Sequence, residues 1–88
     1  MRFKSTVNVY PGKFQDYGFS EVSVDELHNL GFAEVDSVSY NSTDGGIQIT
    51  VVQNADEGLV AIHRTEKMAK CCLAKPNGRF DIVGVVQV

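Results

Sequence analysis

The chain has 88 residues, of which 43% are apolar and 22% charged, and its formal net charge is −3. This composition predicts one folded domain, residues 1–88, because disordered chains combine low hydrophobicity with high net charge. No apolar run approaches the roughly eighteen residues of a membrane span, and residues 1–5 are not followed by the apolar part of a signal peptide. We therefore expect a cytoplasmic protein without membrane contact.

The first residues predict a strand. Between residues 2 and 9, apolar and polar side chains alternate, which is typical of a strand with one buried face. Pro11 and Gly12 end this pattern. Residues 13–22 then predict an irregular loop, with a short extended piece near its end, because Gly18 interrupts the aromatic residues.

A short helix is expected next. Ser23 and Glu26 have the spacing of a capping box, in which each side chain bonds the backbone amide of the other residue. The helix should begin at Val24, and Gly31 should end it in the left-handed conformation. So short a helix is unstable in water by itself, so its apolar side must pack on a sheet. The residues expected in that contact are Leu27, Leu30 and Phe32.

The central feature is a predicted hairpin over residues 46–62. Residues 34–40 return to the period of a strand, and a turn-rich segment connects them to this hairpin. In the hairpin, Ile47, Ile49 and Val51 alternate with polar residues. Residues 54–58 predict its loop, in which Gly58 can take a positive φ. Three consecutive antiparallel strands are therefore expected.

Residues 66–74 predict a second helix with Thr65 as its N-cap, because apolar residues recur there on one side. The alternative is a strand over residues 68–75 that pairs, through a turn at 76–78, with the last segment. That segment, residues 80–88, is apolar on both faces. It is expected to be an interior strand, with an edge strand covered by a second copy of the chain as the alternative.

These elements predict an α+β domain. The expected order is β-α-β-β-β-α-β, with a mostly antiparallel sheet of four or five strands and two short helices packed on one face. The expected core consists of Val7, Leu27, Leu30, Phe32, Val38, Ile47, Ile49, Val51, Leu59, Met68, Leu73, Phe80 and Ile82.

The sequence contains no catalytic or metal-binding motif. His28 and His63 are not accompanied by a serine or cysteine motif that would make either a general base. Cys71 and Cys72 are adjacent, whereas zinc and thioredoxin-type sites separate their cysteines by two residues. We therefore expect no enzyme activity, no cofactor and no metal, although a site assembled from distant residues would leave no local trace.

The distribution of charge is the strongest functional signal. Between Phe14 and Ile62 there is no lysine or arginine. The segments 1–13 and 63–88 each carry a net charge of +3. One interpretation is that the terminal strands neutralise the acidic middle, and the other is that an acidic face attracts a basic protein surface. The nine acidic residues of the middle segment are Asp16, Glu21, Asp25, Glu26, Glu34, Asp36, Asp44, Asp56 and Glu57.

The hypothesis that follows is a non-enzymatic protein-binding module, such as a small inhibitor or accessory protein. Its expected acidic contact residues are Asp25, Glu26, Asp44, Asp56 and Glu57. The first alternative is nucleic-acid binding through the second helix, with phosphate contacts from Arg64, Lys67, Lys70 and Lys75. We regard nucleic acid as the less favoured partner, because no stacking aromatic residue lies among these four cations. A structural or assembly subunit is the other alternative, and the apolar last segment makes a second copy of the chain a further candidate partner.

Overall fold

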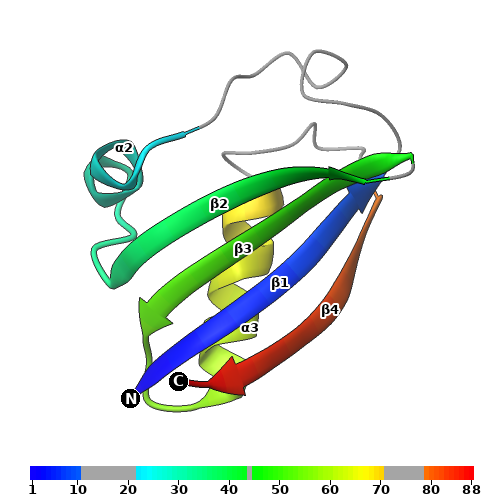
Figure 1. Ribbon diagram of the computed structural model, residues 1–88. Helices are drawn as coiled ribbons and strands as arrows, with labels where there is room; N and C mark the ends of the chain where they lie inside the picture. The colour runs from blue at the N-terminus through cyan, green and yellow to red at the C-terminus, as the bar shows by residue number, and fades with distance from the viewer. Residues whose placement is uncertain (11–21, 44, 71–78) are drawn as a thin grey trace.

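The computed structural model describes residues 1–10, 22–43, 45–70 and 79–88 (Figure 1). It has one four-stranded antiparallel sheet in the order β2-β3-β1-β4, with two helices, which confirms the α+β class. The strands are β1 (Arg2–Tyr10), β2 (Val35–Thr43), β3 (Gly46–Asn54) and β4 (Arg79–Gln87), and the helices are α2 (Val24–Asn29) and α3 (Gly58–Met68).

The two halves of the chain interleave in the sheet. Strand β1 pairs with β3 on one side and with β4 on the other, and β2 forms a hairpin with β3. The strands β1 and β2 are therefore parallel with β3 between them, and β3 and β4 are parallel with β1 between them. This is the arrangement of two split β-α-β units. It places residues from distant parts of the chain side by side on one sheet face.

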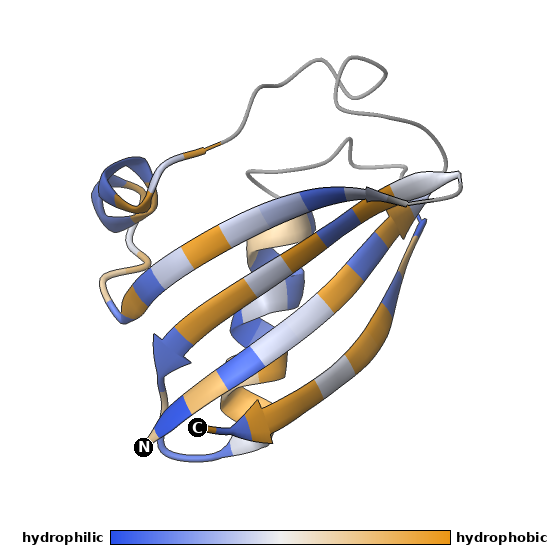
Figure 2. Ribbon diagram, in the orientation of Figure 1, coloured by the Kyte–Doolittle hydropathy of each residue, from blue (hydrophilic) through white to orange (hydrophobic). Residues whose placement is uncertain are grey.

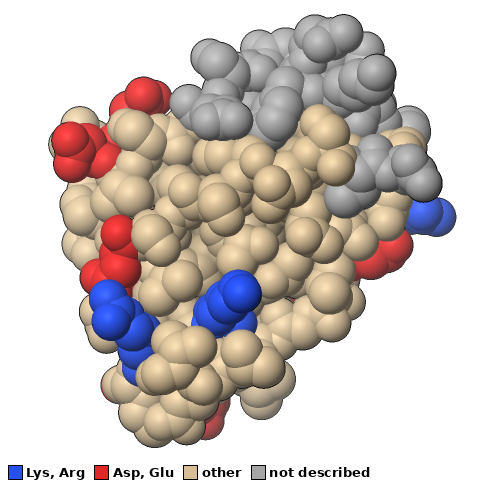
Figure 3. All heavy atoms as spheres, in the orientation of Figure 1, with Lys and Arg blue, Asp and Glu red and all other residues tan. Residues whose placement is uncertain are grey.

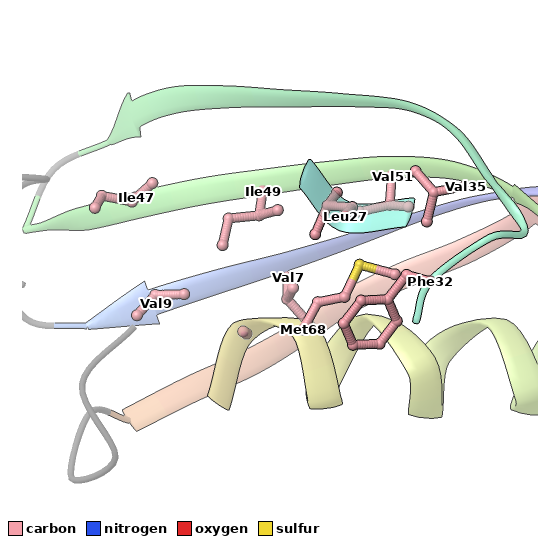
Figure 4. Packing of buried hydrophobic residues seen from close by; sticks show 10 residues of the cluster. Val7, Val9, Leu27, Phe32, Val35, Ile47, Ile49, Val51 and Met68 are labelled. Atoms are coloured by element: carbon pink, nitrogen blue, oxygen red, sulfur yellow. The ribbon is translucent and has the colours of Figure 1, made fainter. Parts of the chain in front are cut away.

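The core lies between the sheet and the two helices. Figure 4 shows Val7 and Ile49 pointing from neighbouring strands toward Met68 of α3, with Leu27 of α2 and Phe32 on the same side. Both helices therefore cover one face, as the sequence predicts. Seven expected core residues are buried: Val7, Leu27, Phe32, Ile47, Ile49, Val51 and Met68. Val38 and Phe80 are partly buried and pack against this cluster.

Helix α2 begins and ends where the sequence predicts. The Ser23 hydroxyl accepts a hydrogen bond from the Glu26 amide at 3.2 Å, and Gly31 has φ +105°. Leu27 is fully buried, but Leu30 is 59% exposed, so its assignment to the core is wrong. The reason is geometric, since six helical residues can direct only one narrow side of the helix toward the sheet.

The second strand of the predicted central hairpin is a helix. Residues 59–62 lie in α3, so β3 is followed by a crossover to β4, and the element order is β-α-β-β-α-β. A short apolar run fits a strand and a buried helix equally well. The buried positions Ala61, Thr65 and Met68 show the helical period of four and three residues. Leu59 was expected in the core but is 77% exposed, on the solvent side of α3.

The boundaries of the second predicted helix also change. It begins at Gly58 rather than near residue 66, and Thr65 is a buried residue inside it rather than its N-cap. Gly58 does not have the positive φ that its predicted place in a hairpin loop requires. Among the described glycines, Gly31 and Gly45 have a positive φ. The alternative prediction, a strand over residues 68–75, is wrong for its first residue, because Met68 is the last residue of α3.

Strand β4 is an edge strand, so the prediction of an interior strand at residues 80–88 is wrong. Among the described strands its neighbour is β1, and Ile82 is 48% exposed rather than buried. The other side of β1 is occupied by β3, which leaves β4 only the outer position.

Some predictions fall outside the described residues. These are the irregular loop at 13–21, the acidic residues Asp16, Glu21 and Asp44, the core residue Leu73, the cysteines Cys71 and Cys72, the cation Lys75 and the turn at 76–78.

Candidate functional site

Two of the expected acidic residues lie on α2. Asp25 and Glu26 are in the first turn of this helix, exposed to solvent, while Leu27 anchors the helix in the core. Carboxylates at this end interact favourably with the helix dipole, so part of their role is structural. Neither carboxylate forms an ion pair with a residue in the described part of the chain.

Two further acidic residues lie at the start of β2, where cations compensate them. The Arg2 guanidinium is 3.0 Å from Asp36, and Arg64 is 4.0 Å from Glu34. The register of β2 against β3 shifts between Val35 and Ser37, which places Asp36 at a bulge. The terminal segments therefore neutralise part of the acidic middle, as one of the two interpretations of the charge pattern predicts.

The remaining described pair, Asp56 and Glu57, lies in the connection from β3 to α3. Both are exposed, and neither forms an ion pair with a described residue. Asp56 lines an open cavity of about 300 Å³ that Glu34 and Arg64 also line, so the loop lies next to the start of β2. The fold therefore places Asp56 close to Glu34, although the two residues are far apart in the sequence.

We call the six described carboxylates of these three places the acidic margin. Figure 3 shows acidic groups over α2 and the start of β2, and again at the end of the molecule where β3 leads into α3. The acidic margin consists of Asp25, Glu26, Glu34, Asp36, Asp56 and Glu57.

Exposed apolar side chains lie beside the acidic margin. A shallow cavity of about 750 Å³ runs along the solvent side of α3, and Phe32, Leu59 and Val60 contribute apolar surface to it. Glu34 and Glu66 line it as well, together with Arg64 and Lys67, so charged groups of both signs surround the apolar residues. Such a mixture of apolar centre and charged rim is typical of protein-binding surfaces. Sequence reasoning placed Leu59 in the core and therefore missed this surface.

Of the four cations proposed for phosphate contacts, Arg64 and Lys70 make contacts within the protein. Arg64 donates hydrogen bonds to the Gln53 side chain at 3.2 Å and to the Asn54 carbonyl at 2.9 Å. The Lys70 ammonium lies 5.3 Å from the centre of the Phe80 ring. Lys67 is exposed, and Lys75 is outside the described residues. The groups proposed for phosphate contacts are therefore partly committed to contacts within the protein.

Three polar residues, Ser5, Gln53 and Thr65, meet in the core beneath α3, and the sequence singled out only Thr65, as an N-cap. The Ser5 and Thr65 hydroxyl oxygens are 2.6 Å apart, and the Gln53 amide nitrogen lies 2.9 Å from the Thr65 hydroxyl. The Thr65 hydroxyl also donates to the Ala61 carbonyl at 2.9 Å. All three side chains are buried, and their hydrogen bonds to one another offset the cost of burial. We interpret this buried polar cluster as structural.

The histidines occupy separate places. The His28 ring nitrogen is 2.7 Å from the Val35 carbonyl oxygen, which ties α2 to β2, and His63 is exposed on α3. Within the described ranges there is no group of three or more His, Cys, Asp or Glu residues that could hold a metal ion.

Comparisons with protein-family models, curated proteins and solved structures gave no significant match. Neither described helix is long and apolar enough to cross a membrane.

Proposed function

We propose that this chain is a cytoplasmic, non-enzymatic protein-binding module, of the kind that serves as a small inhibitor or accessory protein. In this proposal the acidic margin contacts a partner protein with a basic surface. The observation that carries the proposal is the set of four exposed carboxylates without an ion pair among the described residues: Asp25, Glu26, Asp56 and Glu57.

Electrostatics explains what these carboxylates would do. The uncompensated charges form two pairs, one on α2 and one in the connection from β3 to α3, and Figure 3 shows basic side chains between them. Each pair produces a local negative potential that attracts a positively charged group of a partner and repels nucleic acid. By contrast, Glu34 and Asp36 lie close to arginines and contribute less to this potential. The uncompensated charges would mainly accelerate association, since exposed charges act through steering more than through final affinity.

The apolar surface next to the margin would supply affinity. Leu59 and Leu30 are among the most exposed large apolar residues of the described chain, and Val60 adjoins Leu59 on α3. Burial of apolar area releases roughly 25 cal/mol per Å², and apolar contacts usually dominate the stable part of an interface. The fitting partner therefore has lysine or arginine side chains around a central apolar residue.

A direct test changes the loop between β3 and α3. In the variant Asp56→Asn/Glu57→Gln, two charges are removed while the shape of both side chains is kept. Glu57 makes no side-chain capping bond to α3, so we expect the fold to remain intact. Association with a partner captured by the wild-type chain should slow by roughly threefold to tenfold at low salt. Surface plasmon resonance measures this rate directly.

Salt dependence and a control variant complete the test. Wild-type association should slow as the ionic strength rises past about 0.15 M, where the screening length is roughly 8 Å. Asp81→Asn removes a carboxylate that lies outside the acidic margin, and it should leave the rate unchanged. Equal rates for the wild type and the loop variant, without salt dependence, would contradict the proposal. If the protein instead retards nucleic acid in a gel and Lys67→Gln/Lys70→Gln does not, nucleic-acid binding replaces it.

A further inference from the structure

The outer edge of β4 has backbone groups that no described strand pairs with. The Val88 amide donates to the Arg2 carbonyl of β1 at 2.9 Å. Along an antiparallel strand, residues that bond one neighbour alternate with residues whose amide and carbonyl point to the other side. The backbone groups of Val85 and Gln87 therefore point away from β1, toward a side where the described chain has no further strand. These groups can bond another strand.

The side chains along this edge are apolar. Ile82, Val83, Val86 and Val88 are between 48% and 61% exposed, and they make up half of the exposed large apolar residues in the described chain. Figure 2 shows β4 as hydrophobic along most of its length. The part of β4 that follows Asp81 has no charged residue, and an exposed apolar edge strand is a template for pairing with another chain.

The opposite edge of the sheet is protected. The side chains of β2 that point to solvent include Ser37, Ser39 and Asn41, and Asp36 lies at a bulge next to them. Polar side chains, charges and bulges are the features that prevent edge strands from associating. Strand β4 has a register shift of its own, since Thr6 pairs with Gly84 and Val7 pairs with Ile82, and it carries Arg79 and Asp81 at its start. The two edges therefore differ in their solvent-facing side chains, which are polar on β2 and apolar on β4 from Ile82 to Val86.

We propose that β4 pairs in antiparallel orientation with β4 of a second copy of this chain and that the two sheets become one sheet of eight strands. A second copy fits because the same edge can meet itself about a two-fold axis, which closes the assembly. Pairing of β4 with β2 of another copy would leave free edges and produce filaments. Two copies repel one another because each has a net charge of −3. Contact through β4 adds little to this repulsion, because β4 has no charged residue after Asp81.

The size of the edge is sufficient for a dimer. Nine residues of strand extend over roughly 30 Å, and the sheet with its helix layer is roughly 20 Å deep. The product, about 600 Å² per copy and about 1,200 Å² in total, is the lower limit of specific interfaces. We therefore expect a reversible dimer whose dissociation is visible at micromolar concentrations.

Sedimentation equilibrium across the micromolar range tests the proposal. The wild-type mass should rise with concentration from 9.6 kDa toward twice that value. Val83→Lys places a charge in the middle of the edge and should hold the protein at the monomer mass. Ser39→Lys places the same charge on β2 and should leave the dimer intact. Circular dichroism establishes that each variant is folded.

Hydrogen exchange of the wild type gives a second measurement that needs no variant. The outward amides of Val85 and Gln87 should exchange more slowly as concentration rises, while the amides of β2 should not change. A wild-type mass that stays at 9.6 kDa, with fast exchange of these two amides at every concentration, would overturn the proposal. So would a Val83→Lys variant that dimerises like the wild type, or loss of the dimer in Ser39→Lys.

Discussion

Replacing Ile49 by Ala is expected to lower the free energy of unfolding by about 2 to 5 kcal/mol. Ile49 is fully buried at the centre of the sheet, where it pairs with Val7 of β1 and Tyr40 of β2. The substitution removes apolar contacts and leaves a cavity, because three hydrogen-bonded strands cannot collapse into the space. A domain of this size has a free energy of unfolding of only about 5 to 10 kcal/mol, so the variant should be largely unfolded or aggregated.

The matched control is Leu59→Ala, which removes the same kind of side chain from the solvent side of α3. Because Leu59 is 77% exposed, the change should be within about 0.5 kcal/mol of neutral. Urea titration of both variants gives the comparison. A loss below about 1 kcal/mol for Ile49→Ala would show that the other face of β3 is the buried one.

Replacing Thr65 by Val should destabilise the protein by roughly 1 to 3 kcal/mol, although the two side chains have the same shape. The Thr65 hydroxyl bonds the buried Ser5 and Gln53 side chains, and the substitution leaves both with one partner fewer. Buried polar groups that lose a partner carry the cost of their desolvation. Urea denaturation monitored by circular dichroism measures the difference.

Two further variants separate the hydroxyl from the packing. Thr65→Ser keeps the hydroxyl and removes one methyl group, so its loss should be close to about 0.8 kcal/mol. In the double variant Ser5→Ala/Thr65→Val, one of the unsatisfied groups is removed as well, and its loss should be smaller than the sum of the single losses. Additive losses, or a Thr65→Val variant as stable as the wild type, would mean that water satisfies these groups.

The sequence by itself determined the elements whose signals are local. The alternation of Ile47, Ile49 and Val51 predicted β3 and its buried face, since a one-residue shift would expose all three. The spacing of Ser23 and Glu26 predicted the start of α2, because an N-cap bond joins residues three positions apart. Together with the strand pattern of residues 2–9, these signals were enough for the α+β class.

Tertiary structure decided what local patterns leave open. The run at residues 59–62 fits a strand or a helix, and the sheet selected the helix by burying Ala61, Thr65 and Met68 together. The apolar residues of β4 predicted a strand but not its position, since pairing with β1 depends on contacts across the whole chain.

The buried polar cluster and the ion pairs of the acidic margin also depend on contacts between distant parts of the chain. Ser5 and Thr65 are sixty positions apart, and Arg2 and Asp36 are thirty-four apart, so no local pattern connects them. Charge counting could find the acidic segment, but only the fold determined which carboxylates are paired with arginines and which are exposed. Sheet pairing brings residues together by register rather than by sequence distance, and register is a property of the complete fold.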